Sequence, residues 1–174
     1  TTTGTESVIV AGQSNVSSGK SAAVIAGHSN NAEGMASAVV AGLSNIAGGL
    51  YSTIVAGNAN DTAGAYSVVV AGGSNEATAE SAVVVGGQMN QATGNASVVL
   101  SGKSNTAGAS TSGIVAGWLN QTGAQHAAVL GGYDNTSSGD YATVGGGFKN
   151  EASHSGAWVA GSYTDSTGLY TVDF

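Results

Sequence analysis

Histidines and carboxylates are the side chains of this sequence that could carry acid–base chemistry, and their placement does not support it. The three histidines, His28, His126 and His154, lie far apart, and no carboxylate recurs at a fixed spacing from them. The chain has no cysteine, which excludes a thiolate metal site. Its acidic residues do not gather in a calcium-loop pattern. We therefore expect no enzymatic activity, no metal site and no cofactor.

Asparagine is the polar residue with the most regular placement. It recurs every fifteen residues, with a glycine three residues before it and a β-branched residue six residues before it. Amides repeated at one position of stacked coils form ladders that satisfy buried backbone groups. We therefore predict a structural ladder rather than a ligand site. Its members are Asn15, Asn30, Asn45, Asn60, Asn75, Asn90, Asn105, Asn120, Asn135 and Asn150, and Asp165 stands in the eleventh slot.

Aromatic residues fill the slot two residues before the asparagine position in four consecutive repeats. If the repeats stack about 4.8 Å apart, the rings stack along the axis of the molecule. One interpretation is a ladder that stiffens the molecule or adds to an oligomer contact. The other is a platform that binds a sugar or a receptor. The four residues are Trp118, Tyr133, Phe148 and Tyr163.

The regular period also predicts the elements that position these side chains. No insertion or deletion interrupts the fifteen-residue register, and such self-similarity is typical of a solenoid. The β-branched run from Val68 to Val70 suits a strand, and Gly72 permits a corner with positive φ. A second, weaker strand follows Asn75. Frequent glycines exclude helices, because each costs about 1 kcal/mol in a helix interior.

We therefore predict an all-β protein, a single parallel β-solenoid domain over residues 1–174 with about eleven coils and two short strands in each. No terminal cap is visible in the sequence. Thr1 to Glu6 belongs to one coil, and Leu169 to Phe174 begins another. Because solenoids require caps, we expect the chain to continue in a longer parent or to stack head to tail on another copy.

Strand alternation predicts which side chains face the coil interior. In one coil Ser67, Val69 and Ala71 face inward, and Val68 and Val70 face outward. The outward set is apolar in nine successive coils. Strands that are apolar on both sides are normally buried on both sides, so an exposed strip of this size indicates an interaction site. We predict an oligomer interface formed by Val8, Val10, Ile25, Val40, Val55, Val68, Val70, Val83, Val85, Val98, Leu100, Val115 and Leu130.

Charge and hydropathy exclude two classes of partner. The net charge is −7, from ten acidic and three basic residues, which disfavours binding to a phosphate backbone and hence to nucleic acid. No run of about 18 apolar residues occurs, so we expect no membrane insertion.

The repeat Ser-x-Val-Val-Ala-Gly-x-x-Asn-x-Ala-x-Gly resembles that of the head domains of trimeric autotransporter adhesins. The stretch from Tyr141 to Ser153 is similar to related repeats in bacterial surface proteins and phage tail fibres. The resemblance covers essentially the whole chain. It implies a left-handed β-roll, three chains packed through their apolar faces, and an adhesive role outside the cell, at a cell surface or in a virion fibre. The chain departs from the family in using fifteen residues per repeat instead of fourteen, and asparagine where serine is often found.

These observations predict an extracellular structural or adhesive fibre segment that presents a rigid surface for attachment or host recognition. We expect a homotrimer or another homo-oligomer, and a receptor or a glycan as a further partner. One alternative is the subunit of a self-assembling filament that stacks end to end. A second is an ice-binding β-roll, because the half-coil pattern resembles the ice-binding proteins of cold-hardy grasses. Ice-binding faces usually carry ranks of threonine, whereas this face offers only Thr53 and Thr143.

Overall fold

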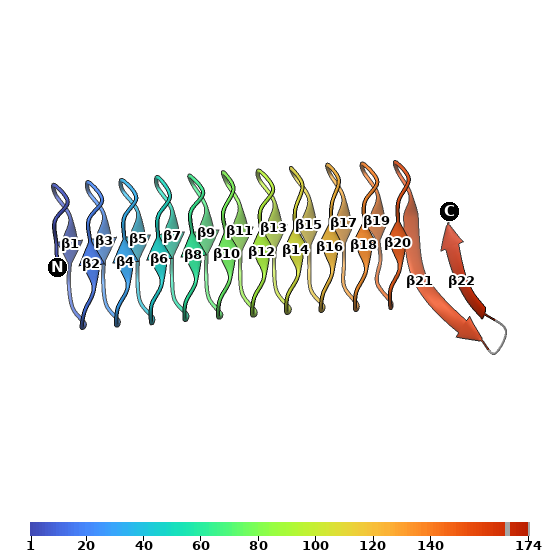
Figure 1. The fold of residues 1–174 in the computed structure, drawn as a ribbon, viewed down its shortest axis with the longest axis horizontal. Coiled ribbons are helices and arrows are strands. Elements are labelled where there is room, and N and C mark those ends of the chain that lie inside the picture. Colours follow the sequence, from blue (N-terminus) through green and yellow to red (C-terminus); the bar gives the residue numbers. More distant parts are fainter. Residues whose placement is uncertain (166–167, 174) are drawn as a thin grey trace.

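The structure, a computed structural model, describes the backbone of residues 1–165 and 168–173 and the side chains of residues 1–161. The chain winds into coils that stack along one axis to form a rod, as the sequence predicts (Figure 1). Ten coils contribute a strand to each of two sheets, and the eleventh contributes to one sheet only. The described residues contain strands and turns but no helix.

The first sheet has twelve strands, which follow one another as β1-β3-β5-β7-β9-β11-β13-β15-β17-β19-β21-β22. From β1 to β21 the pairing is parallel, and each residue pairs with the one fifteen positions later, as Val84 does with Val99. The strands are β1 (Val8–Ile9), β3 (Ala23–Val24), β5 (Ala38–Val39), β7 (Thr53–Ile54), β9 (Val68–Val69), β11 (Val83–Val84), β13 (Val98–Val99), β15 (Gly113–Ile114), β17 (Ala128–Val129), β19 (Thr143–Val144), β21 (Trp158–Asp165) and β22 (Gly168–Asp173).

The second sheet has ten strands, which are all parallel and lie in sequence order. It faces the first sheet across the narrow interior of the rod (Figure 1). Its strands are β2 (Val16–Ser17), β4 (Asn31–Ala32), β6 (Ile46–Ala47), β8 (Asp61–Thr62), β10 (Glu76–Ala77), β12 (Gln91–Ala92), β14 (Thr106–Ala107), β16 (Gln121–Thr122), β18 (Thr136–Ser137) and β20 (Glu151–Ala152).

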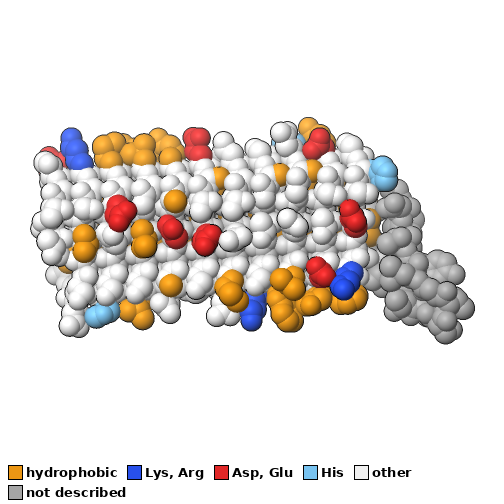
Figure 2. Space-filling view, viewed as in Figure 1, with side chains coloured by type: hydrophobic (Ala, Val, Ile, Leu, Met, Phe, Trp, Pro, Cys, Tyr) orange, Lys and Arg blue, Asp and Glu red, His pale blue; other side chains and the backbone are white. Residues whose placement is uncertain are grey.

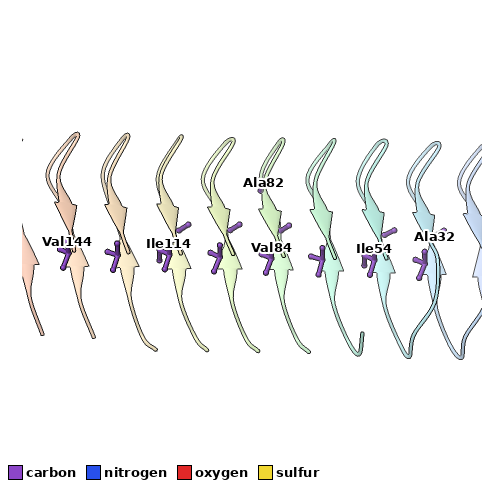
Figure 3. Close-up of a cluster of buried hydrophobic side chains, with 14 of the residues drawn as sticks. Ala32, Ile54, Ala82, Val84, Ile114 and Val144 are labelled. Atoms are coloured by element: carbon purple, nitrogen blue, oxygen red, sulfur yellow. The ribbon is translucent and has the colours of Figure 1, made fainter. Parts of the chain in front are cut away.

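The core is a set of ranks of identical or similar side chains between the two sheets. Val84 and its counterparts from Val24 to Val159 are fully buried, and small residues such as Ala77 and Ala92 fill the space opposite them. Figure 3 shows Ile54, Val84 and Ile114 at the same place in their coils. The predicted inward positions of Ser67 and Val69 are confirmed. Ala71 is only half-buried, because β9 ends at Val69 and strand alternation stops there.

Two kinds of left-handed residue make the corners. Gly27 has a φ of +103°, and a Cβ atom there would lie 2.3 Å from the carbonyl oxygen of Gly42, so glycine is required at this predicted corner. In the first ten coils each corner also contains a non-glycine residue with positive φ, such as Tyr66 at 58° and Ser74 at 53°. This second kind has no signature in residue type and was not predicted.

At the C-terminal end the structure departs from the prediction. Leu169 to Phe174 was expected to begin another coil. Instead β22 pairs antiparallel with β21, with Tyr163 opposite Tyr170, so the first sheet ends in a hairpin that covers the edge of β21 (Figure 1). Ser162 stands where ten earlier repeats have the corner glycine, and without that glycine the strand runs on past the corner. The expectation that both ends lack a cap is therefore wrong for the first sheet at this end, and Phe174 lies outside the described residues.

Candidate functional site

The asparagine side chains form the predicted ladder, with a geometry that the sequence did not specify. Each rung is a backbone N–H that donates to the preceding asparagine, as the Asn90 N–H does to Asn75 Oδ1 at 3.0 Å. The amide nitrogen mostly serves the backbone: Asn75 Nδ2 donates to the carbonyl oxygens of Ala71 and Gly87, both at 3.1 Å. All ten asparagines are buried. Because they are enclosed and engaged in hydrogen bonds, they hold the corner together and offer no surface to a ligand.

The ladder ends at Asn150. Its Oδ1 atom is buried and has no hydrogen-bond partner among the described residues. The sequence predicted Asp165 as the next member, but residue 165 lies in β21, where it pairs with Gly168 in the hairpin. The departure of β21 from the coil path therefore explains the unsatisfied amide oxygen.

The predicted oligomer interface is a continuous apolar strip on the outer face of the twelve-stranded sheet. We use the name apolar strip for the thirteen residues predicted above. Val68, Val70, Val83 and Val98 are half-buried by their neighbours. The others are exposed by between 39% and 64% of their surface, which is unusual for aliphatic side chains in such number. These exposed members are Val8, Val10, Ile25, Val40, Val55, Val85, Leu100, Val115 and Leu130.

The apolar strip is uneven toward the C-terminal end. A hollow of about 180 Å³ opens at Gly113, with Leu100, Val115 and Leu130 among its walls. Gly113 is not required by the coil, because a Cβ atom there would approach only the Val98 carbonyl oxygen, at 3.9 Å. Beyond this hollow the outward residues are Thr143 and Gly145, and the Trp158 ring comes within 3.4 Å of the position of a Cβ on Gly145.

The aromatic column lies at one corner of the coils, which we call the asparagine corner: the two residues before each ladder asparagine. Tyr133 and Phe148 stack with centroids 5.4 Å apart and planes 11° apart. Trp118 meets Tyr133 edge to face at 4.9 Å. Lys103 Nζ lies 5.7 Å from the Trp118 ring centroid, and Lys149 Nζ lies 5.4 Å from that of Phe148. The ring faces are thus occupied within the chain, which favours a stiffening ladder or a lateral contact over a sugar-binding platform.

Tyr163, the fourth predicted member of this column, does not continue it. The parallel pairing of the slot runs as far as Tyr133 and Phe148, whereas residue 163 lies in the antiparallel part of β21. The same loss of the corner glycine that ends the asparagine ladder therefore ends the aromatic column.

A second, less complete aromatic column lies at the other corner of the coils. Each strand of the twelve-stranded sheet is preceded by one inward residue, such as Ser67 before β9. We call the two residues before that inward residue the opposite corner. Tyr51 and Tyr66 stack at 5.4 Å, and His126 and Tyr141 stack at 4.7 Å. The hydroxyl of Thr111 lies 2.7 Å from Nδ1 of His126. Figure 2 shows hydrophobic side chains gathered along both rims of the rod.

The outer face of the ten-stranded sheet is mostly polar, although its outward positions include Val16 and Ile46, of which Ile46 is 41% exposed. Acidic side chains lie along the middle of this face (Figure 2). Burial raises the pKa of Asp61 above its usual value of 3.8, and the charges of Glu76 and Glu33 raise it further. Glu76 also accepts a 3.0 Å hydrogen bond from Gln91 Nε2. The described residues contain no group of three or more His, Cys, Asp or Glu side chains that could hold a metal ion.

No protein-family model matches the sequence, and no curated protein matches it. In the described part of the chain there is also no helix that could cross a membrane.

Proposed function

We propose that this protein is a rigid segment of an extracellular structural or adhesive fibre, and that it works as a homo-oligomer joined through the apolar strip. The observation that carries the proposal is the strip itself, which has at least one outward aliphatic side chain in each of nine successive coils and is exposed in the single chain. At about 4.8 Å per coil it is roughly 40 Å long. Burying an aliphatic side chain is worth about 1.5–3 kcal/mol, so covering this strip strongly favours association.

The polarity of the other face supports a closed oligomer. Its outward residues include Asn31, Asp61, Glu76, Gln91 and Glu151, which remain favourably hydrated. A rod with one apolar face and one polar face associates through the first and stops, whereas a rod with two apolar faces would aggregate. The resemblance to adhesin heads supports three copies.

The interior of the rod supports a structural role. The first ten coils are tied to one another by parallel backbone pairing in two sheets and by the asparagine rungs. Such a stack resists bending and presents its corners at fixed spacing, which suits attachment to a surface or a receptor. The resemblance to adhesin and tail-fibre repeats supports the extracellular location.

End-to-end stacking into a filament has less support. Stacking of coils requires an open strand edge, and β22 covers that of β21 in the first sheet. We therefore favour lateral association over head-to-tail assembly.

The test is to place charge on the apolar strip. Val70→Asp with Val85→Asp should convert the oligomer into monomers or unfolded chains, because the buried carboxylates would have no partners. Thr106→Asp with Gln121→Asp adds the same charge to the polar face and should leave the oligomer intact. Sedimentation velocity and circular dichroism report assembly and folding.

A wild-type chain that sediments as a folded monomer at micromolar concentration would show the proposal to be wrong. The exposed strip would then favour a foreign surface, and thermal hysteresis of that monomer would identify ice as the surface.

A further inference from the structure

We infer that neighbouring copies lie parallel and in register, so that the asparagine corner of one copy contacts the opposite corner of the next copy in the same coil. The inference rests on the proposed association through the apolar strip and adds the residues that fix its geometry. It concerns Gly73, Tyr133, Phe148 and Lys149 on one copy and Tyr66, His126, Asp140 and Tyr141 on the next.

The apolar strip alone is too small for a stable interface, so residues at the corners must add buried area. The strip is roughly 40 Å long and about 10 Å wide, and therefore offers about 400 Å² per copy. Stable interfaces bury about 800 Å² per partner. The missing area has to come from the residues on either side of the strip, and these are the two corners of each coil.

The symmetry of the assembly decides which corners meet. If copies are related by rotation about an axis parallel to the rods, the asparagine corner of one copy faces the opposite corner of the next, coil by coil. If copies run antiparallel, each corner faces its own kind. The two arrangements therefore place different side chains in contact.

Size complementarity within single coils favours the parallel arrangement. Gly73 is the only glycine in its slot among the ten coils that run from Gln13 to Phe148. The coil does not require it, because a Cβ atom would come no closer than 3.8 Å to the Asn58 carbonyl oxygen. The same coil carries Tyr66 at its opposite corner, 51% exposed. A neighbouring copy in register would place its Tyr66 ring in the space that Gly73 leaves.

Two other coils carry an aromatic ring at both corners, where ring-to-ring contact between copies takes the place of size complementarity. Tyr133 shares its coil with His126, and Phe148 shares its coil with Tyr141. These are also the coils in which the strip thins to Ala128 and then to Thr143 and Gly145. Aromatic contacts at the corners would replace the aliphatic contacts that the strip loses there.

Charge is complementary at the same place. Lys149 at the asparagine corner and Asp140 at the opposite corner belong to one coil. Lys149 Nζ makes a long contact of 3.9 Å to Asp134 and lies 5.4 Å from the Phe148 ring centroid, and 59% of the Lys149 side chain is exposed. Asp140 accepts one hydrogen bond, at 3.2 Å, from the backbone of Gln125. In register, each Lys149 faces the Asp140 of the neighbouring copy.

Cysteine cross-linking tests the inference directly, because the chain has no cysteine of its own. The variant carrying Asp140→Cys and Lys149→Cys should form disulfides between copies and migrate on a non-reducing gel as a covalent oligomer. A disulfide within one chain is excluded, because the two corners lie at opposite ends of a strand and a disulfide spans at most about 7 Å between Cα atoms. Gly73→Cys with Asp140→Cys, which pairs different coils, is the matched control and should stay uncross-linked.

The single variants separate the possible arrangements. Asp140→Cys alone and Lys149→Cys alone should not cross-link, whereas a mixture of the two should give linked pairs. Self-linking of a single variant would show that like corners meet and would overturn the inference. An oligomer in which no combination cross-links would also overturn it, while the proposed association stands. A monomeric protein would overturn both.

A second test uses the gap at Gly73. Gly73→Leu leaves the coil intact, since the site has room for a side chain, but fills the space assigned to Tyr66 of the next copy. Association should weaken roughly tenfold or more, and Tyr66→Ala should restore it in the double variant. A Gly73→Leu variant that associates as the wild type does would contradict the inference.

Discussion

The two outer faces of the rod share one backbone geometry and carry opposite chemistry. Val83, Val98 and their neighbours make the face of the twelve-stranded sheet apolar, whereas Asp61, Glu76 and Gln91 make the face of the ten-stranded sheet polar. Both faces are built on the same coils, with the same ladder and the same buried ranks between them. The comparison shows that the inward residues determine the fold and leave the outward residues free to determine what the rod contacts.

The largest effect is expected from breaking what the two faces share. Asn75→Ala removes two hydrogen bonds to carbonyl groups and the acceptor of the Asn90 N–H. The Gly87 carbonyl keeps its bond from the Gly73 N–H at 3.0 Å, whereas the Ala71 carbonyl and the buried Asn90 N–H lose these partners. The free energy of unfolding should fall by about 3–5 kcal/mol. Urea unfolding followed by circular dichroism measures it. Asn58→Ala, which truncates an exposed asparagine one coil away, should change the free energy by less than about 0.5 kcal/mol, and equal losses would refute the structural role of the ladder.

A smaller effect should distinguish the inside of a strand from its outside. Val84 is fully buried, and Val85, the next residue, is 40% exposed. Val84→Ala should cost roughly 2 kcal/mol of folding stability. Val85→Ala should leave the free energy of unfolding of the monomer nearly unchanged, but it should weaken association between copies. Urea unfolding and sedimentation equilibrium separate the two quantities, and a Val85→Ala variant that associates as tightly as the wild type would remove Val85 from the interface.

The period made most of this architecture predictable from the sequence. A residue that recurs every fifteen positions occupies one place in every coil, so Asn75 and Val69 could be assigned to the interior from spacing and type alone. The direction of Val68 and Val70 followed from strand alternation. The surface strip could also be predicted, because each coil repeats the same two outward positions and these line up along the rod when the coils stack.

Other features were not predictable because they depend on backbone geometry that residue type does not reveal. Tyr66 and Ser74 adopt positive φ although nothing in their side chains requires it. Ser162 was visible as a break in the glycine series, but its consequence, a strand that continues into a hairpin, depends on how residues 168–173 pair. The occupation of the ring faces beside Trp118 and Phe148 by Lys103 and Lys149 also required the three-dimensional arrangement.

The smallest effect on the free energy of unfolding is expected on the polar face, from Asp61→Asn. Burial and the charges of Glu76 and Glu33 raise the pKa of Asp61, so the folded state holds its proton more tightly than the unfolded state does. Stability should therefore rise as the pH falls through the raised pKa and level off below the usual value of 3.8. At pH 7 the asparagine variant should be more stable than the wild type by less than about 1 kcal/mol, because solvent screens this half-exposed site.

Urea midpoints between pH 3 and 7 measure the difference in stability. Glu151→Gln removes one charge from the same face, away from Glu33 and Glu76, and controls for net charge. An Asp61→Asn variant that is less stable than the wild type at pH 7 would show that the carboxylate stabilises the folded chain. The outward residues of the polar face would then stabilise the isolated chain, whereas those of the apolar strip stabilise the oligomer.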